Sequence, residues 1–272
     1  MGSCVFADGL KMLSNKKYNT CTASMTNINK LEFVYDGKSD YALIDNQNSK
    51  SKTWVVFFHS FGANAEEIFT SELIHPSWKK LIEQQKFGLI AFNTYGNSWM
   101  APFVADAIHN VLIQVKKEYK IDKLVFVGGS MGGSNVLIYS VRYPKDVQAA
   151  LAMCPVTNVE QHYKELIKNP RQFSEIMLKA YNDFYGESKK ERNTALSLNN
   201  VQKNYKKLTM PVLISHSADD DVISVTMSDG LAKLLYRKND FKYFRYENGG
   251  HSFPSQKGFI DCWDYYIEKY DK

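Results

Sequence analysis

The sequence predicts an α/β fold: an open, mostly parallel sheet with helices packed on both faces. Strand-like and helix-like segments alternate from about residue 53 to the end of the 272-residue chain. The strand-like segments are continuously apolar, which is typical of parallel strands covered on both faces. A domain of this size buries roughly 70–75% of its unfolded surface, so its core needs no disulfide or metal.

Helical spacing appears between the predicted strands. In Phe103–Tyr119, apolar residues recur at intervals of three and four, which predicts an amphipathic helix. The strands themselves are expected at residues 53–59, 87–92, 123–127, 147–153, 211–216 and 241–246.

The N-terminal part departs from this alternation. Lys30–Tyr35 and Asp40–Ile44 flank a turn at residues 36–38, and they predict an antiparallel hairpin at the edge of the sheet. Residues 1–29 are polar and show no periodicity. We therefore expect an irregular segment at 1–29 and a folded domain over 30–272.

Charge and hydropathy weigh against two classes of partner. The chain carries 34 Lys and Arg against 29 Asp and Glu, and the basic residues are spread along it, which disfavours a nucleic-acid groove. No run approaches 18 consecutive apolar residues, so no membrane span is expected. The N-terminus lacks the apolar centre of a signal peptide. The expected compartment is the cytoplasm, or a secreted or periplasmic one if a leader has been removed.

The four cysteines are Cys4, Cys21, Cys154 and Cys262, and no two form a CxxC pair. Cys154 ends an apolar run, so it is expected to be buried. Cys4 and Cys21 share the N-terminal segment, and whether they pair in an oxidising compartment stays open.

The most specific motif is the pentapeptide at 128–132, Gly-Gly-Ser-Met-Gly, between an apolar strand and a helical segment. It has the pattern G-x-S-x-G, in which glycines allow a tight strand-to-helix turn where a Cβ would collide with backbone. Such a turn exposes the Ser130 hydroxyl at the carboxyl end of the sheet. A phosphate-binding loop is the alternative, but its Gly-Lys-Ser/Thr ending is absent. The motif predicts that Ser130 is a nucleophile.

A serine hydroxyl needs a base that accepts its proton and an acid that orients the base. Among six histidines, His251 has the most favourable setting, because it follows Gly249-Gly250 after the last predicted strand. Upstream, another strand runs into three consecutive carboxylates at 219–221, and the order Ser, Asp, His suits such a site. These residues alone leave open which carboxylate acts. No calcium-type ligand loop follows them, so no metal is expected.

Addition of the serine to an acyl carbon creates a negative oxygen that backbone N–H groups must stabilise. Met131 begins the helix after the nucleophile and is expected to supply one N–H. Phe61, in the turn His59-Ser60-Phe61-Gly62 after the first parallel strand, is expected to supply another.

These motifs resemble the α/β-hydrolase superfamily over residues 30–270. The resemblance implies an α/β-hydrolase fold, with a mostly parallel central sheet flanked by helices, and serine hydrolase activity. In that family the acid follows the His of an HG-x-x-D pattern by four residues, which implies Asp220. This chain has Ser60 and Ser217 where the family usually has glycine. The matching segments are HSFG at 59–62, GGSMGG at 128–133, HSADDDVIS at 216–224 and GGH at 249–251.

Within the superfamily, the segment Tyr95–Trp99, the helix containing Asp106, and Tyr119–Asp122 resemble esterases and prolyl-oligopeptidase-like hydrolases. Feruloyl and acetyl-xylan-type carbohydrate esterases are the most similar in these motifs. The resemblance points to an enzyme that cleaves carboxylic esters through an acyl-enzyme on Ser130.

One long segment interrupts the strand–helix rhythm. About 55 residues, Val156 to Thr209, separate two predicted strands, and helical spacing appears in Val159–Ile167 and Phe173–Phe184. We expect a small helical cap at 156–209 over the mouth of the site. An extended crossover helix with a surface loop is the alternative.

The predicted substrates are small-molecule or carbohydrate-linked esters with short or aromatic acyl groups. Tyr95 and Trp99, with Phe61, are expected to form an aromatic wall for the substrate, and no cofactor is expected. A prolyl-oligopeptidase-like peptidase or amidase is the first alternative. A non-hydrolytic binding protein on the same fold is the second, and the presence of all three triad members disfavours it. The sequence specifies neither the ester nor the oligomeric state.

Overall fold

The computed structural model describes residues 5–6, 9–18, 28–47, 49–72 and 74–271. Cys4 and Cys21 lie outside the described residues, so their pairing stays a prediction. Cys154 and Cys262 are both buried as free thiols, which confirms the expectation for Cys154. Among the described residues, no helix combines the length and apolarity needed to span a membrane.

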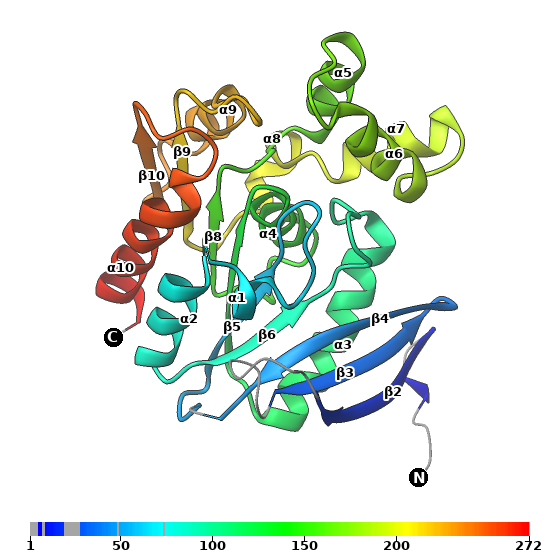
Figure 1. Ribbon diagram of the computed structural model, residues 1–272, viewed down its shortest axis with the longest axis vertical. Coiled ribbons are helices and arrows are strands. Elements are labelled where there is room, and N and C mark those ends of the chain that lie inside the picture. The colour runs from blue at the N-terminus through cyan, green and yellow to red at the C-terminus, as the bar shows by residue number, and fades with distance from the viewer. Residues whose placement is uncertain (1–4, 7–8, 19–27, 48, 73, 272) are drawn as a thin grey trace.

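A ten-stranded sheet forms the centre of the described chain, with the strand order β1-β2-β3-β4-β6-β5-β7-β8-β9-β10 (Figure 1). The six neighbouring strands β6, β5, β7, β8, β9 and β10 pair in parallel. The strands β1 to β4 pair in antiparallel fashion, and β4 joins β6 in antiparallel pairing too. The strand bounds are β1 Val5–Phe6, β2 Leu10–Lys17, β3 Asn29–Tyr35, β4 Lys38–Asp45, β5 Thr53–Phe58, β6 Gly88–Phe92, β7 Lys123–Gly129, β8 Ala149–Met153, β9 Val212–Ser217 and β10 Phe241–Tyr246.

The parallel strands confirm what their continuous apolarity predicts. Every residue of β5, β6, β8 and β9 is buried, because helices cover both faces of these strands. β10 differs, since it pairs with β9 alone at the sheet edge and its residues are only partly buried.

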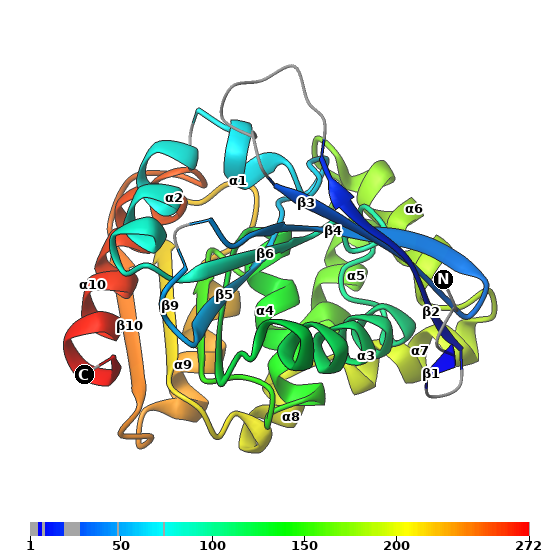
Figure 2. The same cartoon turned by 90° about the horizontal axis from the view of Figure 1, so that it is seen from below.

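Two helical layers cover the sheet, and each buries its own apolar cluster. One layer contains α3 (Pro102–Tyr119), α4 (Met131–Arg142) and α9 (Thr226–Leu235). The other contains the one-turn α1 (Glu67–Thr70), α2 (His75–Gln84) and α10 (Phe259–Tyr270). Figure 2 shows α9 and α10 on opposite sides of β9 and β10. The α/β fold, the hairpin formed by β3 and β4, and the helix α3 are confirmed.

The prediction of an irregular segment at 1–29 is wrong, because β2 lies in it. β2 pairs with β3 from Leu10 opposite Tyr35 to Lys17 opposite Asn29, so the sheet begins before residue 30. Leu10 is the only fully buried residue of β2, and a register shift interrupts the pairing between Met12 and Ser14. The strand is therefore held by pairing with β3, and its own sequence shows little periodicity.

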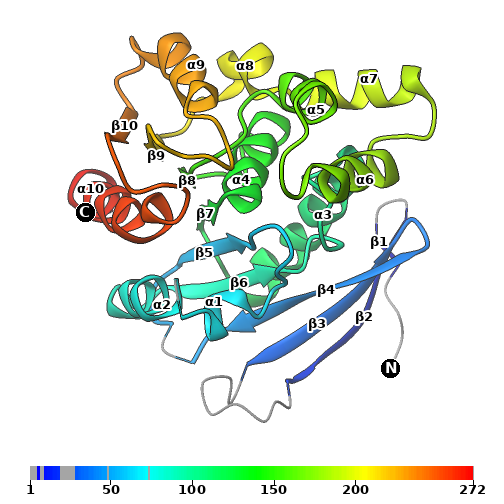
Figure 3. The same ribbon diagram turned by 45° about the horizontal axis from the view of Figure 1, so that its top comes forward.

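The segment between β8 and β9 is helical. It contains α5 (Val159–Lys168), α6 (Ser174–Phe184), α7 (Lys189–Leu198) and the short α8 (Val201–Asn204). The side chain of Asn158 caps α5, and Ser188 and Glu191 form a capping box on α7. Figures 1 and 3 place α5, α6 and α7 together at the end of the molecule where the parallel strands have their carboxyl ends. We call α5–α7 the inserted helices.

Candidate active site

Ser130 occupies the turn between β7 and α4, at the carboxyl end of the sheet. Its φ of 56° and ψ of −120° are strained for a residue with a side chain. The flanking glycines explain why the turn forms: a Cβ at Gly128 would overlap Gly132, and a Cβ at Gly132 would overlap the carbonyl oxygen of Phe58. The strain therefore presents the hydroxyl of Ser130 beyond the strand end.

His251 lies beside this hydroxyl. Its Nε2 is 2.9 Å from Ser130 Oγ, and its Nδ1 is 2.8 Å from Asp220 Oδ2. Because an ionised carboxylate only accepts hydrogen bonds, Nδ1–H donates to Asp220 and Nε2 accepts the Ser130 O–H. Gly249 and Gly250 have φ values of 131° and 59°, which lets the loop turn back over the sheet. The structure thus brings the predicted nucleophile, base and acid into one hydrogen-bonded chain.

Asp220 is the carboxylate that contacts His251, and its side chain is fully buried. Its Oδ1 accepts N–H donors from Val222 and Ile223, each at 2.9 Å, and its Oδ2 lies 3.1 Å from His216 Nε2. Burial acts to raise the pKa of Asp220, but the hydrogen bonds from His216 and His251 outweigh it and hold that pKa well below its usual range. The carboxylate is therefore ionised when His251 works.

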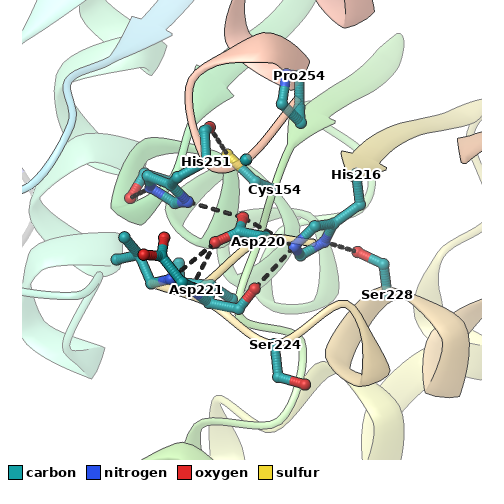
Figure 4. Close-up of polar contacts among 12 residues, drawn as sticks. Cys154, His216, Asp220, Asp221, Ser224, Ser228, His251 and Pro254 are labelled. Atoms are coloured by element: carbon teal, nitrogen blue, oxygen red, sulfur yellow. Dashed lines mark hydrogen bonds and ion pairs between the residues drawn. The ribbon is translucent and has the colours of Figure 1, made fainter. Parts of the chain in front are cut away.

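From the sequence, His216 served only to locate the acid and was assigned no role of its own. Figure 4 shows His216 and His251 on opposite sides of Asp220. The His216 ring is fully buried, and its Nδ1 lies 2.7 Å from Ser228 Oγ. The backbone oxygen of Ile223 lies 3.0 Å from His216 Nε2 and can only accept, so Nε2 carries the hydrogen and Nδ1 accepts from Ser228. The Nε2–H therefore lies close to both the Ile223 oxygen and Asp220 Oδ2. The signal available in the sequence was a histidine in an otherwise apolar strand, four residues before the acid.

The neighbouring carboxylates have other roles. Asp219 is exposed and accepts the backbone N–H groups of Gly249 at 3.1 Å and Gly250 at 2.8 Å. It thereby holds the loop that carries His251, and the hydrogen bond from Gly250 lowers the pKa of Asp219. Asp221 is exposed too, and its backbone oxygen accepts a hydrogen bond from Arg171 of the inserted segment at 2.9 Å.

Nearby groups change the pKa of His251. Burial acts to lower the pKa of His251, but the Cys154 sulfur and the Asp220 carboxylate outweigh burial and raise that pKa. The Cys154 thiol lies 3.6 Å from the backbone oxygen of His251. Among the described residues, Cys154, Asp220 and His251 are the only Cys, His or acidic side chains grouped closely enough to ligate a metal. Hydrogen bonds already occupy Asp220 and both ring nitrogens of His251.

The two predicted oxyanion donors follow β5 and β7, which are neighbours in the sheet. Met131 is the first residue of α4, so its N–H has no acceptor within the helix. Phe61 lies in the turn after β5, with its ring against Trp99. In the part of the chain that the structure describes, neither the Phe61 nor the Met131 N–H donates a hydrogen bond. Both remain free to bind an oxyanion.

The structure contradicts the predicted substrate contact of Trp99. Its side chain is fully buried, packed on Phe61 and stacked on Tyr181 of α6 with ring centroids 5.3 Å apart. Trp99 therefore supports the inserted helices instead of lining the site. Tyr95 is partly buried against Phe33 and Phe103, and its contact with substrate stays a prediction.

A cavity of about 410 Å³ lies between the inserted segment and the loop after Asp220. Ser130 and His251 do not line this cavity, and its walls reach the candidate site through intervening residues. On one side His162 packs against Trp99, which contacts the Phe61 turn. On the other side Val222 donates its N–H to Asp220. The lining residues are His162, Glu165, Leu166, Asn169, Arg171, Gln172, Phe173, Ser174, Met177, Asp221, Val222, Ser224 and Met227.

Solved structures with this fold include two esterases. Est1E from Butyrivibrio proteoclasticus is 16% identical, with a TM-score of 0.66 over 87% of this chain and 97% of that one. Acetyl xylan esterase 1 from Thermoanaerobacterium sp. JW/SL YS485 is 15% identical, with a TM-score of 0.61 over 97% of this chain and 89% of that one. Because the sequence identities are low, this structural similarity shows that the chain has the α/β-hydrolase fold and nothing beyond the fold.

Relatives by sequence include a peptidase and an acyltransferase. The proline iminopeptidase of Clostridioides difficile is 25% identical over 167 residues, 60% of this chain. The 1-acylglycerol-3-phosphate O-acyltransferase ABHD5 of Rattus norvegicus is 26% identical over 135 residues, 45% of this chain. The matches span 56% and 35% of those proteins. The prolyl oligopeptidase family matches residues 103–266, more than half of the chain. The chain therefore belongs to the prolyl oligopeptidase family and has the α/β-hydrolase fold.

Proposed function

We propose that this protein hydrolyses carboxylic esters with short or aromatic acyl groups, including carbohydrate-linked esters, through an acyl-enzyme on Ser130. The observation that carries the proposal is the continuous chain of hydrogen bonds from Ser130 through His251 to Asp220. A base at 2.9 Å from the serine oxygen is within the reach that proton transfer requires.

The geometry supports a two-step reaction. His251 Nε2 takes the Ser130 proton as the serine oxygen adds to the acyl carbon, and Asp220 stabilises the imidazolium that forms. The N–H groups of Phe61 and Met131 bind the negative oxygen of the tetrahedral intermediate. Collapse expels the alcohol, which takes the proton from His251. Water then adds to the acyl carbon as His251 takes one of its protons. The second tetrahedral intermediate collapses, Ser130 Oγ leaves with the proton from His251, and the carboxylic acid is released.

The inserted helices are proposed as a cap that selects the substrate. The cavity beneath them combines apolar side chains, such as Phe173 and Met177, with polar ones at its rim. A volume of about 410 Å³ falls in the range of small-molecule sites. Burial lowers the pKa of His162 to about 4, so His162 is uncharged at neutral pH. The apolar side chains of the cavity, with this uncharged histidine, suit an aromatic or short acyl group.

A peptidase or amidase is the second candidate, and two observations favour it. The chain belongs to a family named for peptidases, and a proline iminopeptidase is among its relatives. The cavity also contains the carboxylates Glu165 and Asp221, which would attract the ammonium group of a peptide.

A substrate panel separates these functions. It comprises p-nitrophenyl esters of increasing chain length, feruloyl esters, acetylated sugars and aminoacyl p-nitroanilides, each assayed with the wild type and with Ser130→Ala. We expect short and aromatic esters to give the highest kcat/KM and Ser130→Ala to be inactive on all of them. Faster cleavage of the anilides would establish the peptidase instead. A jump in activity when long-chain esters form droplets would identify a lipase.

A further inference from the structure

Two side chains hold the turn that carries Phe61. The N–H of Ser60 donates to Glu67 Oε2 at 2.8 Å, and the N–H of Gly62 donates to Asn97 Oδ1 at 2.7 Å. These donors lie on either side of Phe61, whose own N–H has no acceptor within the described residues. The turn is therefore held at Ser60 and Gly62, and the N–H of Phe61 between them is left without an acceptor in the part of the chain that the structure describes.

Four residues in the loop that carries Asn97 have a strained backbone. Thr94, Tyr95, Trp99 and Met100 have φ values of 51°, 53°, 49° and 53°, in the left-handed region that residues with a side chain rarely adopt. Strain of this kind persists only where the surrounding contacts determine the conformation, and it is concentrated at functional sites. A loop with four such residues is held in place for a reason beyond connecting β6 to α3.

The contacts that hold the loop are at both of its ends. At the start, the buried Asp40 accepts the Tyr95 N–H at 2.8 Å and the side-chain amide of Asn93 at 2.7 Å. At the end, Tyr185 O–H donates to the Trp99 carbonyl at 2.6 Å, and the Asn199 amide donates to the Met100 carbonyl at 2.7 Å.

Asn97 thus sits midway along a loop that is anchored to β4 at one end. The other end is anchored to the segment of the inserted helices. Because neither end of the loop is free to shift, the position of Asn97 relative to the Phe61 turn is set by the fold.

We propose that Asn97, assisted by Glu67, is a positioning residue that sets the direction of the Phe61 N–H toward the oxyanion. This inference rests on the proposed function. The arrangement also accounts for Ser60 in place of the family's glycine: its backbone has no positive φ, so the turn accepts a Cβ. Since Glu67 already occupies the Ser60 N–H, the turn offers only Phe61 to the substrate.

The decisive variant is Asn97→Ala, with Asn64→Ala as its matched control. Asn64 is exposed, directly follows the Phe61 turn, and accepts only the Glu66 N–H with its side chain. We expect Asn97→Ala to lower kcat by roughly 10–100-fold with KM changed less than about threefold, because a misplaced donor weakens the transition state more than the bound substrate. Affinity for a boronic acid that forms a tetrahedral adduct on Ser130 should fall in the same proportion. Asn64→Ala should retain wild-type kinetics.

A second pair of variants keeps the test independent of folding. Glu67→Gln retains an oxygen acceptor for the Ser60 N–H, whereas Glu67→Ala removes it. We therefore expect Glu67→Gln to stay close to the wild type and Glu67→Ala to lose kcat at an unchanged melting temperature. A loss confined to KM, or a kcat that is equal in Asn97→Ala and Asn64→Ala, overturns the positioning role. If Ser130→Ala itself remains active, the proposed function fails instead.

Discussion

The two halves of the candidate site are built on different kinds of structure. Ser130, Asp220 and His251 follow the parallel strands β7, β9 and β10, so the regular spacing of the sheet brings them together. The Phe61 turn and the cavity instead depend on irregular loops and inserted helices, which contact one another through single hydrogen bonds and ring contacts.

The two halves are therefore expected to control different properties, namely proton transfer and substrate binding. In the proposed reaction, the strand-end half contains the groups that move protons, which directly follow regular strands. The loop half contains the groups proposed to bind the oxyanion and the acyl chain, and these depend on contacts between irregular segments. We therefore expect changes in the first half to abolish chemistry and changes in the second to alter rate and selectivity by smaller factors.

The largest effect should come from the nucleophile and base. Ser130→Ala and His251→Ala should each lower kcat by on the order of 10⁴–10⁶, because neither group can transfer the proton without the other. For the same reason the double variant should be no slower than either single one. Steady-state kinetics and labelling by a fluorophosphonate measure this. Further loss in the double variant would show that the two residues act independently.

The acid should show the next largest effect. Asp220→Asn should lower kcat by roughly 10³–10⁴, because the amide no longer selects the Nδ1–H form of His251. Asp219→Asn is the matched control: it keeps one of the two acceptor oxygens for the loop N–H groups and should cost about tenfold or less. Asp221→Asn should cost no more, since only the backbone oxygen of Asp221 is engaged. A greater loss at either neighbour would assign the acid there.

Much of the first half could be predicted from sequence, because its signals are local. The glycines around Ser130 and the glycine pair before His251 mark turns that few other residues allow. Trp99 was misassigned because an aromatic residue in a loop carries no signal for the direction of its side chain. Only the packing of α6 on Trp99 reveals that it is buried. β2 was missed because its pairing with β3, and not its own pattern, makes it a strand.

The pH dependence should reflect the raised pKa of His251. The base must be unprotonated, so kcat/KM should rise with pH as His251 loses its proton, at a pH above its ordinary value of 6.5. At pH values below the pKa of His251, kcat/KM should fall about tenfold per pH unit, because the unprotonated fraction of His251 falls by the same factor. Asp220→Asn removes a carboxylate that favours the imidazolium, so its rise in kcat/KM should move to lower pH. If kcat/KM of the wild type instead rises around pH 6.5 or lower, the pKa of His251 is not raised by its surroundings.

The smallest effect should come from the cap, and it should appear as a change in selectivity. Phe173 is 50% exposed and lines the cavity, so Phe173→Ala enlarges the space for the acyl group at little cost to the core. We expect kcat/KM for feruloyl esters relative to acetate esters to change by about fivefold, since one apolar contact discriminates substrates by modest factors. Ile176 lies in the first turn of α6, which begins directly after Phe173; it is 54% exposed and is not part of the cavity. Ile176→Ala should therefore leave that ratio unchanged, with both melting temperatures close to the wild type. Equal ratios in the two variants would mean that the inserted helices support the fold without selecting the ester.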